Sequence, residues 1–269
     1  MESEPFPGIA ERLANADGLL LGLDFDGTLA PIDEDPDAPT IDPATRRSVE
    51  RFVDEPDATV AVVSGRELAD LRSRVGIDGM VYAGNHGLEL DRGDGVEVPP
   101  DARDARSSLR RTLERLRERL DGIEGWEIED KGLTATVHVR GVPPDRVDEV
   151  RSAVSASVQE ATEARDPADG LTSNHGKQVF EIRPDVDRDK GVTMECLSSE
   201  APDGWLTMYL GDDVTDEDAF SAIRPEGVGV LVGTREDTTA TYRLPGQDAV
   251  APFLNRIANI VFDDGGTGP

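Results

Sequence analysis

Residues 18–32 read GLLLGLDFDGTLAPI, and this stretch decides the fold. Its first part is an unbroken apolar run, which is typical of a strand buried on both faces of a parallel sheet. Polar residues follow at once, beginning with Asp24 and Asp26. Ligands of open parallel sheets bind where the strands end, so this boundary is the first candidate position for a functional site.

The same change from apolar to polar residues recurs along the chain. The further strands that we predict are ATVAVVS (58–64), MVYAGN (80–85), WLTMYLGDD (205–213) and GVGVLVG (227–233). Segments with helical periodicity separate them, for example residues 43–55 and 66–75. This alternation predicts an α/β fold with a parallel sheet and crossover helices.

The pattern changes between about residues 100 and 186. Leucines recur every three or four residues from 109 to 120, which indicates a helix. Two β runs, a second helix and two more β runs follow. The order αββαββ predicts a small α+β domain with an antiparallel sheet. We therefore predict a core of residues 1–99 and 187–269, with residues 100–186 as an inserted domain.

The charge balance excludes nucleic acid as an expected partner. The 269 residues include 56 Asp and Glu against 28 Lys and Arg, a formal net charge of −28, which repels a phosphate backbone. Only three of the basic residues are lysine, and 25 are arginine. We interpret this composition as halophilic, an adaptation to high salt, because mobile ions screen the repulsion among solvated carboxylates.

Other features predict a cytoplasmic protein without disulfides. No apolar run approaches the roughly 20 residues that a membrane-spanning helix requires. The first residues lack the basic start and apolar stretch of a signal peptide. The single cysteine, Cys196, has no intramolecular partner and lies in no metal-ligand spacing. We expect a monomer with no membrane contact.

Carboxylates gather where the predicted strands end. Those after the first strand and after WLTMYLG are Asp24, Asp26, Asp212, Asp213 and Asp216. If they converge, like charges at that density need a cation. All-oxygen ligands favour a hard ion, and we predict Mg²⁺. The alternative for any single cluster in so acidic a chain is a set of solvated acidic turns.

The same residues suit the hydrolysis of a phosphate ester. An aspartate such as Asp24 can attack phosphorus and form an aspartyl-phosphate. Asp26 can then serve as the acid and base for the leaving oxygen and for water. Gly27 lets the backbone approach the phosphoryl oxygens, and Ser64 and Lys190 can neutralise their charge.

The motifs resemble a known family. DFDGTLAPI, VVSGR, the lysine of DRDKG and GDDVTDEDAF are similar, in order, to the four motifs of the haloacid dehalogenase superfamily of phosphatases. YAGNHGLEL, VHVR and GKQVFEIRP resemble the trehalose-6-phosphate phosphatases within it. The resemblance covers residues 18 to about 233. It implies a Rossmann-like core with an inserted αββαββ cap, Mg²⁺, and hydrolysis of trehalose 6-phosphate.

The resemblance also implies roles for individual core residues. Asp24 is similar to the nucleophile and Asp26 to the general acid/base. Ser64, Lys190 and the Gly27 backbone would bind phosphate. The implied Mg²⁺ ligands are Asp24, the backbone carbonyl of Asp26, Asp212 and, in a supporting role, Asp213.

Substrate contacts are expected from both predicted domains. Lys177 and Glu181 resemble the residues with which the family grips the disaccharide, and a spacing of four puts both on one face of a strand. The other residues that we predict to bind substrate are Arg140, Lys131, Arg66, Asn85 and His86.

Two alternatives remain open at this stage. A related phosphatase for sucrose 6-phosphate, mannosyl-phosphoglycerate or glucosyl-phosphoglycerate would keep the core motifs and differ in the cap. A non-catalytic regulatory module of a trehalose-synthesising complex would keep the fold alone. If the chain hydrolyses trehalose 6-phosphate, we expect as partners a small sugar phosphate and, by functional coupling, a trehalose-6-phosphate synthase.

Overall fold

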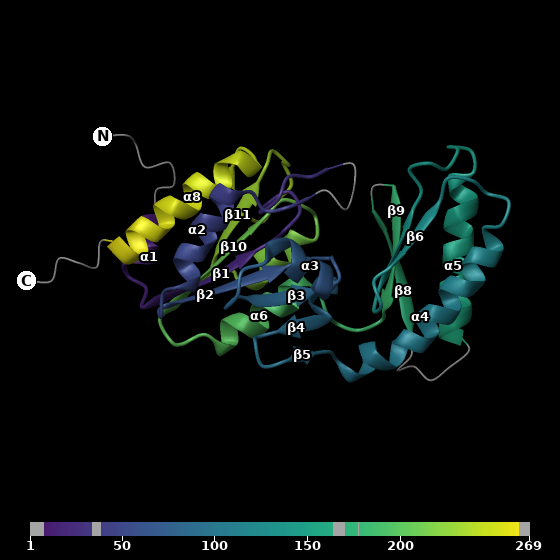
Figure 1. The fold of residues 1–269 in the computed structure, drawn as a ribbon, viewed down its shortest axis with the longest axis horizontal. Helices are drawn as coiled ribbons and strands as arrows, with labels where there is room; N and C mark the ends of the chain where they lie inside the picture. The colour runs from purple at the N-terminus through teal and green to yellow at the C-terminus, as the bar shows by residue number, and fades with distance from the viewer. Residues whose placement is uncertain (1–7, 34–38, 164–169, 177, 264–269) are drawn as a thin grey trace, which may run out of the picture. The chain divides into compact units, whose positions relative to one another are not determined.

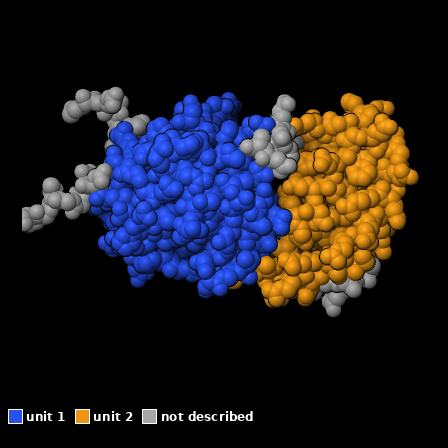
Figure 2. Space-filling model, viewed as in Figure 1, with its two compact units in different colours: residues 1–96, 188–269 blue, residues 97–187 orange. Residues whose placement is uncertain are grey.

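The computed structural model describes residues 8–33, 39–163, 170–176 and 178–263. The chain divides into two compact units (Figure 2). Unit 1 consists of residues 1–96 and 188–269, and unit 2 of residues 97–187. Within the described ranges, no helix is both long and apolar enough to cross a membrane.

Unit 1 is built on an eight-stranded sheet (Figure 1). In spatial order its strands are β12 (Tyr242–Leu244), β11 (Val228–Val232), β10 (Trp205–Gly211), β1 (Gly18–Leu23), β2 (Ala58–Val63), β3 (Val81–Gly84), β4 (Glu89–Asp91) and β5 (Val96–Glu97). The first six strands are mutually parallel, and β4 pairs antiparallel with β3. The predicted α/β fold with a parallel-sheet core is confirmed.

Strand β1 lies between β2 and β10, and all six of its residues are buried. Leu23 at its end is level with Val62 of β2 and Leu210 of β10. The loops that follow these three strands therefore leave the sheet at the same edge, which brings three distant stretches of sequence together.

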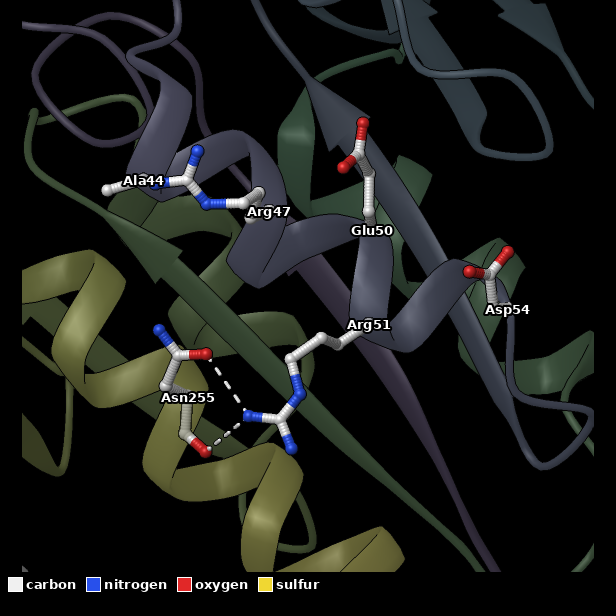
Figure 3. A pocket seen from close by; sticks show the side chains of 6 residues that line it. All are labelled: Ala44, Arg47, Glu50, Arg51, Asp54 and Asn255. Atoms are coloured by element: carbon white, nitrogen blue, oxygen red, sulfur yellow. Dashed lines mark hydrogen bonds between the residues drawn. The ribbon is translucent and has the colours of Figure 1, made fainter.

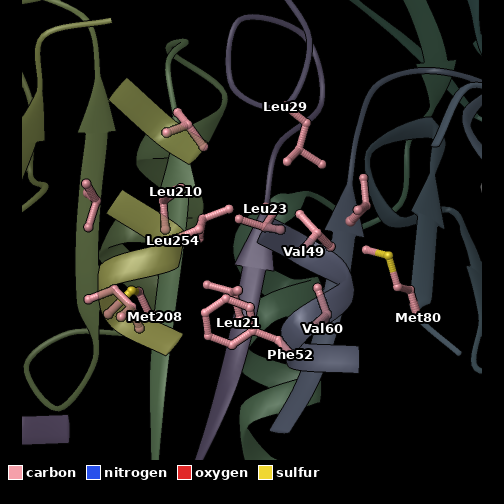
Figure 4. Packing of buried hydrophobic residues seen from close by; sticks show 14 of the residues in the cluster. Leu21, Leu23, Leu29, Val49, Phe52, Val60, Met80, Met208, Leu210 and Leu254 are labelled. Atoms are coloured by element: carbon pink, nitrogen blue, oxygen red, sulfur yellow. The ribbon is translucent and has the colours of Figure 1, made fainter. Parts of the chain in front are cut away.

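Helices cover both faces of this sheet. Successive strand residues point to opposite sides, and the apolar side chains on each side are buried beneath helices. On one face lie α1 (Ile9–Ala14), α2 (Pro43–Val53), α3 (Leu68–Val75) and α8 (Val250–Ala258), packed on the odd-numbered leucines of β1 (Figure 4). On the other lie α6 (Lys190–Glu200) and α7 (Asp216–Ala222), packed on Leu20 and Tyr209. The sheet is therefore largely apolar on both faces, and most of the polar residues of the site come after its strands; Thr207 and the Tyr209 hydroxyl are polar groups within β10.

Helices α2 and α8 are also joined by polar contacts. Arg51 donates to the backbone and side-chain oxygens of Asn255 at 3.2 and 3.1 Å (Figure 3). The lining of the adjacent surface hollow consists of Ala44, Arg47, Glu50, Arg51, Asp54 and Asn255. It contains none of the residues predicted to act on a substrate.

Unit 2 has the predicted order of elements. They are α4 (Pro100–Arg119), β6 (Glu127–Asp130), β7 (Ala135–His138), α5 (Val147–Glu163), β8 (Leu171–Gly176) and β9 (Val179–Pro184). The sheet order is β6-β7-β9-β8, with antiparallel pairs throughout. Val137, Phe180 and Ile182 pack against α4 and α5 and are buried. The residues between them therefore project from the face that the helices do not cover.

Candidate active site

The centre of the site is Asp24, the first residue after β1. Its backbone N–H donates to the carbonyl of Leu210 at 2.9 Å, which ties it to β10. Its side chain is almost completely buried, with the whole residue 4% exposed. An isolated carboxylate at such a position is costly, so its partners determine its charge.

Lys190 supplies the opposite charge. It opens α6, whose N-cap Asp189 accepts a hydrogen bond from the Val192 N–H at 2.8 Å. Its ammonium donates to Asp24 Oδ1 at 2.6 Å and to Asp216 Oδ1 at 2.7 Å. Burial alone would lower the pKa of Lys190, but the two carboxylates raise it above its usual value. The ammonium therefore stays protonated between two buried acids.

Asp216 holds this arrangement in place. Its Oδ1 accepts bonds from Lys190 and from the Tyr209 hydroxyl at 2.8 Å. Its Oδ2 accepts the backbone N–H groups of Asp212 and Asp213, each at 2.9 Å. Four donors occupy the carboxylate, so Asp216 fixes the loop after β10 and positions Lys190.

Three carboxylates nevertheless approach one another closely. One oxygen from each of Asp24, Asp212 and Asp216 lies within 4.8 Å of the others. Burial raises the pKa of Asp24 well above its usual value, and Asp216 and Asp212 add to the rise while Lys190 opposes it. Burial, followed by the charges of Asp216 and Asp213, raises the pKa of Asp212 to about 7. A single ammonium does not balance this cluster, which suits a cation bound by oxygen ligands.

The predicted metal ligands differ in how they are placed. Asp24 and Asp212 belong to the cluster, whereas Asp213 has an exposed side chain. Because Asp216 is occupied by four donors, Asp24 and Asp212 are the carboxylates available to a cation. The ligand roles of Asp213 and of the Asp26 carbonyl stay predictions.

Gly27 lies where no side chain fits. Its φ is +80°, in the left-handed region that favours glycine. A Cβ at this position would also collide with the Asp212 carboxylate. The Gly27 N–H donates to the Ala30 carbonyl at 2.8 Å and closes a tight turn after β1. The turn therefore brings bare backbone against the carboxylate cluster.

The loop after β2 carries Ser64 and Arg66. Ser64 is buried, and its Oγ accepts the Arg66 N–H at 3.2 Å. The Arg66 guanidinium binds Asp26 through two hydrogen bonds, from Nε at 2.8 Å and from Nη2 at 2.7 Å. The structure thus directs Arg66 to the predicted acid/base. Its predicted contact with substrate stays a prediction.

Asn85 and His86 follow β3 in a left-handed turn. Their φ values are +48° and +57°, which is uncommon for residues other than glycine. The Asn85 N–H donates to the Arg66 carbonyl at 2.7 Å, and the His86 N–H donates to the Ser64 carbonyl at 2.9 Å. Asn85 is fully buried, and its amide donates to Glu89 at 2.7 Å. These contacts support the loop of Ser64, and a direct contact of Asn85 and His86 with substrate stays a prediction.

The predicted cap residues lie in unit 2. Glu181 is on β9, opposite Thr136 of β7 and Asn174 of β8, and Thr136 is opposite Glu129 of β6. Opposed residues on adjacent strands project from the same face. Glu181 therefore belongs to a polar row on the face away from the helices.

The remaining predicted cap residues are less well defined. Lys131 follows β6, and its ammonium lies 3.9 Å from Glu129. Arg140 follows β7 and is exposed. Lys177 lies outside the described residues.

The sequence reasoning missed Tyr209. Its hydroxyl lies in the strand WLTMYLG, where the apolar run hides a polar group. Two features of the sequence point to it: a buried tyrosine hydroxyl needs a hydrogen-bond partner, and Tyr209 lies two residues before the GDD triplet.

Solved structures show which fold this is. The chain is similar in fold to a haloacid dehalogenase-like hydrolase from Bacteroides thetaiotaomicron, with a TM-score of 0.62 at 14% identity over 89% of this chain and 99% of that one. The family model for trehalose-phosphatase matches residues 22–248. The chain belongs to the trehalose-phosphatase family.

Individual relatives agree with this assignment. The trehalose-phosphate phosphatase of Mycobacterium marinum is 38% identical over 267 residues, which cover 94% of this chain and 66% of that protein. The chain thus spans just under two thirds of the length of that curated relative. The C-terminal domain of trehalose-6-phosphate phosphatase from C. albicans has a TM-score of 0.76 at 24% identity, over 95% of this chain and 97% of that one. Trehalose-6-phosphate phosphatase from Aspergillus fumigatus has a TM-score of 0.67 at 26% identity, over 93% and 96%.

Proposed function

We propose that this chain is a Mg²⁺-dependent phosphatase that hydrolyses trehalose 6-phosphate through an aspartyl-phosphate. The observation that carries the proposal is the buried Asp24 carboxylate with Lys190 at 2.6 Å and Asp212 beside it at the carboxyl edge of the sheet. Membership of the trehalose-phosphatase family supports the identity of the substrate.

In the first step a carboxylate oxygen of Asp24 attacks phosphorus. A bond forms between that oxygen and phosphorus, and the bond from phosphorus to the sugar oxygen breaks. Asp26 gives a proton to the departing oxygen, which leaves as the sugar hydroxyl. Lys190 and Ser64 stabilise the phosphoryl oxygens during the transfer, because the charge that develops there faces donors already in place.

In the second step water replaces the aspartate. Asp26, now ionised, takes a proton from water as the water oxygen attacks phosphorus. The bond from phosphorus to Asp24 breaks, which restores the carboxylate and releases inorganic phosphate. The step returns both aspartates to their starting states.

The carboxylate cluster fits Mg²⁺. Its donors are oxygens without a thiolate or an imidazole, which is the ligand set of hard cations. Asp24 and Asp212 would hold the ion, and Asp213 and the carbonyl of Asp26 would complete the protein ligands. When bound, Mg²⁺ supplies positive charge that lowers the repulsion between the phosphate ester and these carboxylates.

The polar face of unit 2 is the proposed sugar site. Glu129, Glu181 and Asn174 lie in one row across the sheet, and each has oxygen atoms that accept hydrogen bonds from sugar hydroxyls. These acceptors suit the hydroxyl groups of a disaccharide. Lys177, Lys131 and Arg140 are proposed to add contacts from the strand ends.

The test is phosphate release across a panel of esters with Mg²⁺ in molar salt. The panel contains trehalose 6-phosphate, sucrose 6-phosphate, mannosyl-phosphoglycerate, glucosyl-phosphoglycerate and p-nitrophenyl phosphate. We expect the highest kcat/KM with trehalose 6-phosphate, loss of turnover with EDTA, and no turnover by Asp24→Asn. A higher kcat/KM with another sugar ester would replace the proposed substrate. Absence of turnover on every ester at several salt concentrations would favour the regulatory module.

A cap variant separates sugar binding from chemistry. Glu181→Ala should lower kcat/KM for trehalose 6-phosphate by roughly 10- to 150-fold, which corresponds to the loss of one charged hydrogen bond. The kcat/KM for p-nitrophenyl phosphate should stay nearly unchanged. Glu118→Ala is the matched control because Glu118 is an exposed carboxylate on α4, away from the polar row. Equal losses on both esters for Glu181→Ala would contradict its assignment to the sugar.

A further inference from the structure

We infer that Arg66 is a positioning residue that fixes the carboxylate plane of Asp26 for proton transfer. The inference rests on the proposed function and assigns Arg66 a role through Asp26 in place of direct contact with the substrate. It concerns only residues of unit 1.

Asp26 needs an external support. It lies three residues beyond the end of β1, in the loop that turns at Gly27, and its side chain is 39% exposed. An exposed aspartate in a loop is free to change its χ1 rotamer. General acid and base catalysis requires the proton to be within about 3 Å of the reacting oxygen, so free rotation would lower the fraction of productive geometry.

Arg66 provides the support through a two-point contact. Nε donates to Asp26 Oδ2 and Nη2 donates to Oδ1, at 2.8 and 2.7 Å. The planar guanidinium matches the planar carboxylate, so two parallel bonds fix both its position and its plane. Each carboxylate oxygen accepts one bond from Arg66 and keeps a second lone pair. This pair of parallel hydrogen bonds, the Arg66 fork, therefore orients Asp26 and leaves it able to exchange a proton.

Arg66 is itself held from several directions. Nη1 donates to Asp70 at 3.1 Å, and the guanidinium lies over the Phe25 ring at 5.4 Å from its centroid. The Arg66 side chain is 15% exposed. At least three of its five N–H groups are thus committed to Asp26 and Asp70. The Arg66 guanidinium is thus fixed in place, and it can fix the Asp26 carboxylate in turn.

The backbone of Arg66 is fixed by the left-handed turn after β3. Asn85 donates its N–H to the Arg66 carbonyl at 2.7 Å, and His86 donates its N–H to the Ser64 carbonyl at 2.9 Å. The His86 ring lies where a Cβ on Gly65 would collide at 2.5 Å. Left-handed conformations are strained for residues other than glycine and persist only where surrounding contacts impose them. The turn thus connects β3 to Arg66, and through Arg66 to Asp26.

Aryl phosphates test this role independently of the sugar. Phenyl phosphate needs protonation of its leaving oxygen, whereas p-nitrophenyl phosphate does not. Arg66→Ala should lower kcat/KM for phenyl phosphate by roughly 10- to 100-fold, part of the 10²–10⁴ that an acid/base supplies, and for p-nitrophenyl phosphate by less than about 3-fold. For phenyl phosphate, the kcat/KM of Arg66→Lys should lie between those of wild type and Arg66→Ala, because an ammonium keeps the charge but cannot form two parallel hydrogen bonds.

A double-mutant cycle distinguishes positioning from direct binding. Single-turnover rates would be measured with enzyme in excess for Arg66→Ala, Asp26→Asn and the double variant. If Arg66 acts through Asp26, adding Arg66→Ala to Asp26→Asn should change the phenyl phosphate rate by less than about 2-fold. Arg74→Ala is the matched control, because Arg74 on α3 also binds Asp70 and donates a further guanidinium bond to the Pro39 carbonyl. It should leave both aryl esters within about 2-fold of wild type.

The outcomes separate the inference from the proposed function. Losses that multiply in the double variant, or equal losses on the two aryl esters, would overturn the role of Arg66 and leave the phosphatase intact. A wild-type chain without turnover on any ester would overturn the proposed function and the inference together. A stronger leaving-group dependence in Arg66→Ala than in wild type, absent in Arg74→Ala, supports the positioning role.

Discussion

The pKa of Asp212 leads to a prediction about stability without metal. Burial and two neighbouring carboxylates raise this pKa from 3.8 to about 7. The folded chain then binds a proton more tightly than the unfolded chain, so stability is lost as the pH rises from about 4 to about 7. Asp212→Asn removes the ionisation. The variant should therefore be more stable than the wild type in EDTA, and more so at pH 8 than at pH 5.

The size of the effect follows from the pKa. Between pH 5 and the pKa of about 7, one buried carboxylate changes the free energy of unfolding by about 2.7 kcal/mol, at 1.36 kcal/mol for each tenfold step. Asp212 is partly exposed, and solvent screening reduces the change to about 1–2 kcal/mol. For a chain of this size that amounts to roughly 2–8 °C in Tm.

The assay is thermal unfolding of both proteins at pH 5 and pH 8, in EDTA and in Mg²⁺. Asp203→Asn is the control because it removes the same charge from an exposed residue outside the carboxylate cluster. Mg²⁺ should reverse the order at pH 8, since only the wild type keeps the carboxylate. A difference between Asp212→Asn and wild type that is the same at both pH values in EDTA would refute the reasoning.

Three further perturbations test other parts of the structure. Lys190→Met removes the ammonium between Asp24 and Asp216 and should cost about 3–5 kcal/mol in denaturant unfolding, because two buried carboxylates lose their partner; wild-type stability would contradict this. Gly27→Ala should abolish turnover through its collision with Asp212, whereas Gly93→Ala, with a positive φ and open space around it, should cost stability alone; equal activities would argue against the close approach at Gly27. Thermal stability should rise steeply from dilute buffer to molar KCl, since screening removes repulsion among the acids of a chain with a net charge of −28; an unchanged Tm would exclude the halophilic interpretation.

Much of the fold could be predicted because its strands are unusually apolar. GLLLGLDF, ATVAVVS and WLTMYLGDD correspond to β1, β2 and β10, and their order implied a parallel sheet. The prediction omitted β12 (Tyr242–Leu244), which has three residues and no repeating pattern. It also omitted α1 (Ile9–Ala14), which is too short for periodicity to reveal.

The site was less predictable where the role of a residue depends on its hydrogen-bond partners. Residues that end strands were found because strand ends meet at one edge, and Lys190 was conspicuous in a chain with three lysines. The engagement of Asp216 by four donors and the fork of Arg66 on Asp26 depend on side-chain directions that spacing does not encode. The left-handed turn at Asn85 was equally hidden, because asparagine adopts many conformations.

The pairing of β1 with β10 sets the order in which the chain can assemble during synthesis. Gly18 pairs with Trp205, so the sheet cannot bring Asp24 to Asp212 until both segments have left the ribosome. Unit 2 is one continuous segment, residues 97–187, and its strands β6, β7, β8 and β9 pair only with one another. Its collapse shortens the loop that β1 and β10 must close, which lowers the entropic cost of that closure. The inserted unit can therefore fold while the carboxylate cluster still exists as two separate halves.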